Sequence, residues 1–132
     1  MGTRSTLHIK DGKKTIASIY RQYDGYPTGM GKDIKTLLND GDVRVQNGFS
    51  SSDVIPKHFN GLRCLGAYLI GALKTDKIGG IYLTDSKDRQ EYNYFLSLDN
   101  SDIAMKVTNY ENKVIFKGLL SEFDADIVEN IA

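Results

Sequence analysis

The sequence is poor in the residues that build cross-linked or metal-bound proteins. Its 132 residues include one cysteine, two histidines, two prolines and no tryptophan. Cys64, being alone, cannot form an internal disulfide, and its spacing from His8 and His58 matches no zinc site. We therefore expect neither a disulfide nor a bound metal, and no cofactor.

Long apolar runs and an excess of charge are also missing. No segment approaches the roughly eighteen consecutive apolar residues of a membrane span, and the N-terminus lacks the apolar core of a secretory signal. The 17 basic and 17 acidic residues give a formal net charge of zero. Binding of duplex nucleic acid normally needs a basic excess. We therefore expect a cytoplasmic protein that binds neither duplex nucleic acid nor a membrane.

The rest of the composition is that of an ordinary globular protein. Hydrophobic residues make up 40% of the chain and charged residues 26%. A chain of this length buries most of the apolar surface that its unfolded form exposes. No internal repeat or low-complexity segment interrupts it. The sequence predicts a single domain over residues 1–132.

The N-terminal half predicts a β-hairpin and two helices. "STLHIKD" alternates apolar and polar residues, an Asp-Gly pair turns the chain and "TIASIYRQY" returns, which predicts a hairpin over residues 5–23. "KDIKTLLND" has helical spacing. Residues 42–57 predict a loop with room for one short strand. A wide apolar stripe predicts a central buried helix over residues 58–74.

The C-terminal half predicts a four-stranded antiparallel meander and a terminal helix. The strands are "GGIYLTD", "EYNYFLSL", "IAMKVTNY" and "VIFKGLL", separated by turns of hairpin length. In "SEFDADIVENI", Ser121 is the predicted N-cap of the helix. The fold class is therefore α+β, with helices packed on one mainly antiparallel sheet.

Common catalytic motifs are missing from the sequence. It contains no P-loop, dinucleotide fingerprint, nucleophile elbow or paired-histidine zinc motif. His8 shares a predicted strand face with Thr6 and Lys10, where a lone histidine is more often a surface residue than a general base. We therefore expect a protein that is not an enzyme.

One stretch, "YRQYDGYPTGMG" at residues 20–31, combines residue types that bind ligands. Tyrosines offer flat faces for stacking, arginine donates to phosphate or carboxylate, and glycines let a backbone come close to a ligand. The same letters also describe a turn at Asp24 and Gly25, stiffened by Pro27, whose tyrosines cover a helix. Both interpretations stay open at this point.

Arg4 joins the candidate site because the strands of a hairpin are antiparallel, which brings its segment beside the loop after the second strand. The predicted ligand-binding residues are Arg4, Tyr20, Arg21, Gln22, Tyr23, Asp24, Gly25, Tyr26, Gly29 and Gly31.

The N-terminal third resembles a family of small uncharacterised phage and prophage proteins. The motif of that family is Met-Gly-x-Arg-Ser, followed by Ile-Tyr-x-x-Tyr-Asp-Gly-Tyr-Pro and Gly-x-Gly. This sequence carries "MGTRS" at residues 1–5 and "IYRQYDGYPTGMG" at residues 19–31. The resemblance implies a viral protein in a host cytoplasm. By analogy with small phage inhibitors and sponges, it also implies an anti-defence role.

Three functions are compatible with these features. The first is a homo-oligomeric, non-enzymatic protein that sequesters a nucleotide-like or phosphorylated signalling molecule and so evades host immunity. The second is an inhibitor or adaptor that occupies a host defence protein through a sheet edge or residues 42–57. The third is a nucleotide-processing enzyme with His8 and Asp24 as acid and base.

Overall fold

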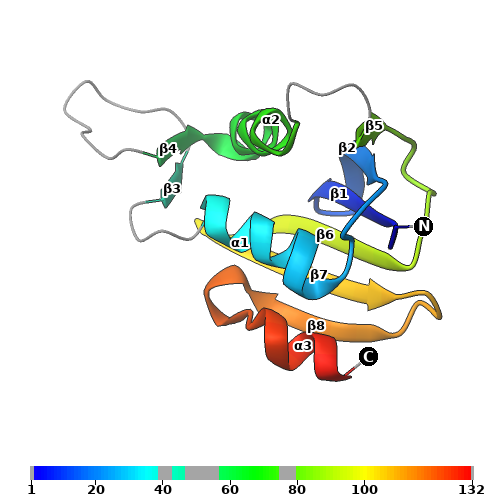
Figure 1. The fold of residues 1–132 in the computed structure, drawn as a ribbon. Coiled ribbons are helices and arrows are strands. Elements are labelled where there is room, and N and C mark those ends of the chain that lie inside the picture. The colour runs from blue at the N-terminus through cyan, green and yellow to red at the C-terminus, as the bar shows by residue number, and fades with distance from the viewer. Residues whose placement is uncertain (1, 39–42, 47–56, 75–79, 132) are drawn as a thin grey trace.

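The computed structural model describes residues 2–38, 43–46, 57–74 and 80–131. Within these ranges, three helices pack on a six-stranded sheet, which confirms the predicted α+β class (Figure 1). The sheet strands are β1 (Ser5–Asp11), β2 (Lys14–Arg21), β5 (Ile81–Leu83), β6 (Tyr92–Asp99), β7 (Asp102–Asn109) and β8 (Val114–Leu119). The helices are α1 (Lys32–Leu38), α2 (Gly61–Leu73) and α3 (Ala125–Ile131). Short π-helical and 3-10 turns span Pro27–Gly31 and Leu120–Glu122.

The sheet has the strand order β5-β2-β1-β6-β7-β8. β1 lies near its centre, antiparallel to β2 and parallel to β6. The predicted meander is correct for β6, β7 and β8 and wrong for its first strand, because β1 already occupies the place beside β6. β5 instead pairs with β2, with Leu83 opposite Ile19, and forms the far edge of the sheet.

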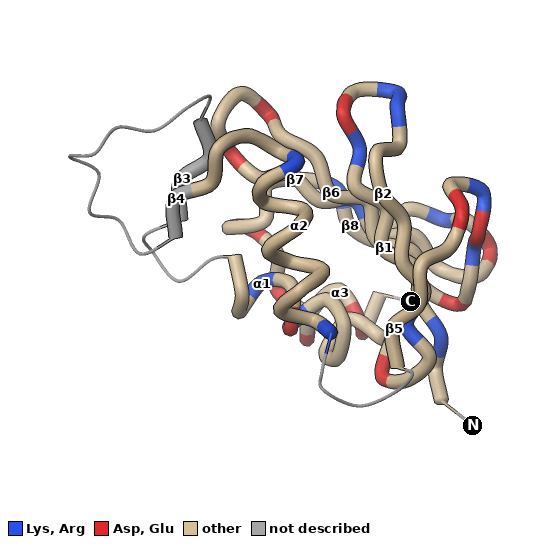
Figure 2. Tube along the Cα trace, turned by 90° about the horizontal axis from the view of Figure 1, so that it is seen from above, with Lys and Arg blue, Asp and Glu red and all other residues tan. Residues whose placement is uncertain are grey.

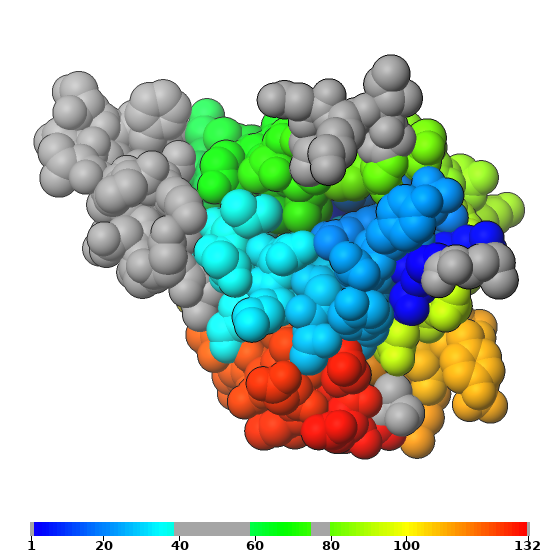
Figure 3. Space-filling view, in the orientation of Figure 1, coloured from blue at the N-terminus to red at the C-terminus, as the bar shows by residue number. Residues whose placement is uncertain are grey.

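The apolar residues of alternating strand positions face the helices. Leu7 and Ile9 of β1 are buried there, beside their paired residues in β6 and, across β6, in β7. The helices contribute Ile34, Leu65 and Val128 to the same core. Figure 3 shows α1 filling the space between α2 and α3 over this face of the sheet.

Helix α2 differs from its predicted form. α2 begins at Gly61, and only Leu65, Gly66 and Leu69 of its residues are buried, so it covers the sheet with one side and is less buried than predicted. None of the described helices has the length and apolar character needed to cross a bilayer.

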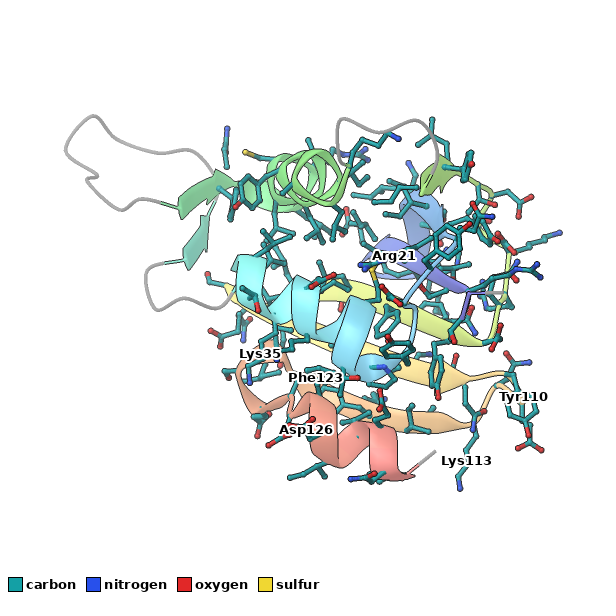
Figure 4. The ribbon with its side chains drawn as sticks, viewed as in Figure 1. Arg21, Lys35, Tyr110, Lys113, Phe123 and Asp126 are labelled. Atoms are coloured by element: carbon teal, nitrogen blue, oxygen red, sulfur yellow. The ribbon has the colours of Figure 1, made fainter. Side chains whose placement is uncertain are left out.

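The cap of α3 is Asp124 and not the predicted Ser121. Asp124 Oδ1 accepts hydrogen bonds from the backbone N–H groups of Asp126 at 3.1 Å and Ile127 at 3.2 Å. Ser121 lies instead within the 3-10 turn. A carboxylate at this position also suits the positive end of the helix dipole. Figure 4 shows Lys35 of α1 against Phe123, whose backbone carbonyl accepts a hydrogen bond from the Lys35 ammonium.

Two further strands, β3 (Val43–Gln46) and β4 (Lys57–Asn60), form a separate parallel pair before α2. β3 lies near the start of the segment predicted as a loop over residues 42–57, and β4 begins at its last residue, Lys57. The remainder of that segment, residue 42 and residues 47–56, lies outside the described residues.

Candidate functional site

The polar groups of the loop after β2 bond mainly to the protein itself. Arg21 Nη1 donates to Asp33 Oδ2 at 2.8 Å and to the Met30 sulfur at 3.2 Å. Arg21 Nε donates to the backbone carbonyl of Tyr23 at 2.8 Å. The Arg21 side chain is only 17% exposed (Figure 4). These contacts tie the end of β2 to the start of α1.

The glycines of the same loop allow close approach between parts of this chain. A Cβ added at Gly25 would lie 2.6 Å from Ser5 Cβ, and one at Gly29 would lie 2.1 Å from the Asp24 carbonyl oxygen. A Cβ at Gly31 would lie 2.7 Å from Phe123 Cζ. Each glycine therefore has a structural reason to be there.

The three tyrosines of the loop point to different surroundings. Tyr20 lies beside Tyr82 of β5, with ring centroids 6.0 Å apart. The Tyr26 hydroxyl donates to Asp24 Oδ1 at 3.0 Å, and this bond raises the pKa of Tyr26. Tyr23 is half-exposed, and its ring lies against Gly2. The rings do not form one stacking platform.

The remaining predicted residues are spread around this loop. Arg4 is exposed, and its backbone N–H donates to Glu91 Oε1 at 3.3 Å. The Gln22 N–H donates to the carbonyl of Gly80 at 2.9 Å. Arg21, Tyr23 and Asp24 do share one cavity of about 370 Å³. The role of these residues in ligand binding stays a prediction.

The face of the sheet opposite the helices, which we call the open sheet face, has a different character. One row of directly paired residues crosses five strands on it. The row runs from β2 to β8 and consists of Ser18, His8, Phe95, Lys106 and Lys117. In Figure 2, charged residues gather at the β1–β2 turn and in the loop after β5, whereas α2 carries charge only near its ends.

A hollow of about 740 Å³ lies on the open sheet face, twice the volume of the cavity beside Arg21. Basic residues from β1, β7, β8 and the loop before β6 line it, together with two acidic residues. The basic residues are Lys10, Arg89, Lys106 and Lys117, and the acidic residues are Asp99 and Glu122.

Phe95 is at the centre of these cations. Lys106 Nζ lies 4.7 Å and Arg89 Cζ 4.9 Å from the centroid of its ring. The His8 ring stacks on Phe95 with centroids 5.3 Å apart. Attraction between a cation and an aromatic ring helps to hold two like charges near one point. Phe95 therefore organises the positive charge of the open sheet face.

Among the described residues, none of the four cations of the hollow has a carboxylate partner. Arg21 and Asp33 form the one ion pair in the part of the chain that the structure describes. Arg89 donates instead to the backbone carbonyls of Ser86 and Asp88, at 3.0 and 2.8 Å. Lys106 and Lys117 also lie directly opposite each other on neighbouring strands, an arrangement of like charges that destabilises a sheet. An anion could neutralise this charge.

His8 is fully buried, which corrects the prediction that it is a surface residue. The loop before β6 covers it: Nε2 lies 3.0 Å from the carbonyl oxygen of Asp88, while Nδ1 and the Ser18 hydroxyl are hydrogen-bonded at 2.7 Å. Burial lowers the pKa of His8, and the charges of Arg89 and Lys10 act in the same direction, partly offset by Asp88. The ring is therefore neutral near pH 7.

The described residues show no geometry that would support catalysis by His8 and Asp24 or the binding of a metal ion. The polar contacts of His8 are with Ser18, Asp88 and Arg89, whereas the Asp24 carboxylate accepts from Tyr26. Within the described ranges, no group of three histidine, cysteine, aspartate or glutamate residues could hold a metal ion.

Sequence reasoning missed Phe95, Lys106 and Lys117 as candidates. One signal was available in "EYNYFLSL", where Phe95 shares its strand face with Glu91, Asn93 and Ser97 and is therefore the aromatic residue of a polar face. The neighbouring lysines come from strands whose order only the fold reveals.

A comparison of the chain with protein-family models, curated proteins and solved structures returns no match. The case for a site therefore depends on the geometry described above.

Proposed function

We propose that the protein is a non-enzymatic binder of a nucleotide-like, phosphorylated ligand, which the open sheet face holds. The observation that carries the proposal is the pair of lysines, Lys106 and Lys117, placed opposite each other with no carboxylate partner. An opposed pair of like charges costs a sheet up to about 1 kcal/mol. A phosphate between the two ammonium groups would turn this repulsion into two charge-assisted hydrogen bonds.

The aromatic content of the hollow favours a nucleotide over inorganic phosphate. Phe95 and Leu119 present apolar surface beside the cations, so a ligand with a flat ring and a phosphate would use both parts of the lining. Small-molecule sites typically combine an apolar lining with a few polar groups in this way.

The biological setting of the proposal depends on the resemblance to phage proteins. In that setting, the protein is a sponge that sequesters a phosphorylated signalling molecule in the host cytoplasm and so evades host immunity. A homo-oligomer would raise the number of ligand molecules captured per particle. Binding without turnover is all that this role requires.

Isothermal titration calorimetry against cyclic nucleotides and ADP-ribose derivatives tests the proposal. The double variant Lys106→Ala with Lys117→Ala should bind at least about tenfold more weakly, since a hydrogen bond to a charged group contributes roughly 1.5–3 kcal/mol. The matched variant Arg4→Ala with Tyr23→Ala changes two exposed residues of the predicted loop site and should bind as the wild type does.

Other results would overturn the proposal. Loss of binding in the Arg4 and Tyr23 variant, with the lysine variant unaffected, would place the site at the loop after β2. An absence of binding to every nucleotide would reject the ligand class. Conversion of the ligand, detected by chromatography after the protein is denatured, would show an enzyme.

Protein binding is a second candidate function, favoured by the exposed edge of the sheet. The edge strand β5 has three residues, of which Tyr82 is about half exposed and Leu83 is 83% exposed. An exposed edge can accept a strand from another protein. A host protein captured in stoichiometric amount, and lost on Leu83→Lys but not on the lysine double substitution, would support this function.

A further inference from the structure

We infer that the open sheet face recognises a dinucleotide unit, with one phosphate at Lys106 and Lys117 and a second at Arg89 and Lys10. The inference rests on the proposed function and adds the class of ligand. The shared chemistry is two phosphate groups joined through a nucleoside. A cyclic dinucleotide and a single-stranded nucleic acid both present it.

The cations of the hollow fall into two groups, separated by a strand. Lys106 and Lys117 lie on β7 and β8. Lys10 lies on β1, and Arg89 contacts the β1 residue His8, with Nη1 3.1 Å from Nε2. Phe95 on β6 stands between the groups because β6 pairs with β1 on one side and with β7 on the other. With Lys106 Nζ at 4.7 Å and Arg89 Cζ at 4.9 Å from the Phe95 centroid, one phosphate on each side of this ring would neutralise both groups.

The charge of the lining matches two phosphodiesters. Four basic and two acidic side chains line the hollow, which leaves a net charge of +2. One of the two acids, Glu122, already accepts a hydrogen bond from the backbone N–H of Leu119 at 3.1 Å. Two phosphodiester groups carry a charge of about −2 and would neutralise this excess without the release of any internal ion pair.

Thr108 is a second observation that points to a ligand, independent of charge. It lines the hollow from β7, two residues beyond Lys106, and only 6% of its surface is exposed. Its hydroxyl is buried and has no hydrogen-bond partner. Buried polar groups in folded proteins nearly always have one. A phosphate or base oxygen beside Lys106 would supply the missing acceptor.

The size of the hollow fits the same class. Its volume of about 740 Å³ lies in the upper part of the range of roughly 300–1,000 Å³ that small-molecule sites occupy. The space is therefore large enough for more than one nucleotide. A longer single strand would have to continue beyond it over the rim of the sheet.

Calorimetry with a graded set of probes tests the inference. The probes are thymidine 5′-monophosphate, a 5′-phosphorylated thymidine dinucleotide, cyclic di-AMP and a single strand of about ten thymidines. At least one two-phosphate probe should bind about tenfold or more tighter than the monophosphate. The slope of log K against log salt should steepen by about 0.7 for each added phosphate contact.

Two single variants locate the second phosphate. Arg89→Ala removes one cation from the β1 side, and Lys10→Ala removes the other without touching the carbonyl contacts that hold the loop before β6. Each should bring the affinity for the two-phosphate probe close to that for the monophosphate. Lys32→Ala is the matched control, because Lys32 is an exposed lysine of α1 on the helical side of the sheet.

The outcomes separate this inference from the proposed function. Equal affinity for the one-phosphate and two-phosphate probes would overturn the inference while the proposed function stands. A complete absence of binding would overturn both. If the inference holds, tighter binding of cyclic di-AMP than of the single strand identifies a small signalling molecule as the source, and the reverse order identifies single-stranded nucleic acid.

Discussion

The loop after β2 and the open sheet face contain similar residue types, but their charged groups differ in how far they bond within the protein. In the loop, the Arg21 guanidinium is bonded to Asp33 and to the Tyr23 carbonyl. On the open sheet face, Lys106 and Lys117 lie opposite each other without a carboxylate. An arginine next to tyrosines can therefore hold a fold together, whereas lysines around one phenylalanine leave charge available to a ligand. Whether the charged groups bond within the protein therefore distinguishes a structural loop from a candidate ligand site better than residue composition does.

The first prediction probes the loop and has the largest expected effect. Gly25→Ala should destabilise the protein by roughly 3 kcal/mol, because the new Cβ would lie 2.8 Å from the Arg4 carbonyl carbon and 2.6 Å from Ser5 Cβ. The shift would also disturb the Gly25 carbonyl, which accepts a hydrogen bond from the buried Tyr94 hydroxyl at 2.7 Å. Urea unfolding followed by circular dichroism measures the change.

Gly71→Ala is the control for this substitution. Gly71 lies inside α2, and a Cβ there would meet nothing within 4 Å. The change should stabilise the protein by about 0.5–1 kcal/mol through helix propensity alone. Equal effects of the two alanines would show that Gly25 is not tightly packed against Arg4 and Ser5.

The second prediction concerns His8, which lies on the open sheet face beneath the loop before β6. Folding lowers the pKa of His8 from its ordinary value of 6.5. Between the ordinary and the lowered pKa, the unfolded chain therefore binds more protons than the folded protein. The free energy of unfolding should therefore decrease as the pH falls through about 6.5 towards the lower folded pKa. Thermal unfolding between about pH 7.5 and pH 5.5 measures this dependence.

His8→Gln should flatten the pH dependence, although it also removes buried hydrogen bonds and lowers stability at every pH. A pH dependence that persists in the His8 variant would assign the titration to another group.

The third prediction is the smallest and has the opposite sign to the first. Lys117→Gln should stabilise the unliganded protein by a few tenths of a kcal/mol, because it removes the repulsion from Lys106 across the strands. The gain should shrink as salt is added, since salt screens exposed charges. Urea unfolding at low and high salt compares this variant with Lys32→Gln. A destabilised Lys117 variant would mean that the lysine contributes to the fold.

Most local elements of the fold could be predicted from the sequence. The hairpin, α1, the three strands β6 to β8 and α3 all have clear periodicity and turn residues, so their existence followed from local patterns. The place of β5 did not, because three residues carry little pattern and their partner, β2, is distant in the sequence. Asp124 and Ser121 are both good caps by type, and only the 3-10 turn at Leu120–Glu122 decides between them.

The loop after β2 and the open sheet face likewise differ in how far the sequence predicts them. The loop was conspicuous because its tyrosines and glycines are consecutive, although most of its polar groups bond within the protein. The open sheet face could not be predicted because its members come from five strands and the loop before β6, which only the strand order brings together. The burial of His8 likewise depends on a loop about 80 residues later in the chain, where Asp88 and Arg89 contact the His8 ring.

The central position of β1 also bears on how the protein is made. β1 leaves the ribosome well before its partner β6, and the Thr6 hydroxyl donates to Asn93 Oδ1, 87 residues later, at 2.7 Å. Until β6 is synthesised, the hairpin has an unpaired edge and an uncovered apolar face. Contacts so distant in sequence slow folding and lengthen the exposure of such edges. Nascent chains that stop before β6 should therefore be the species that chaperones retain.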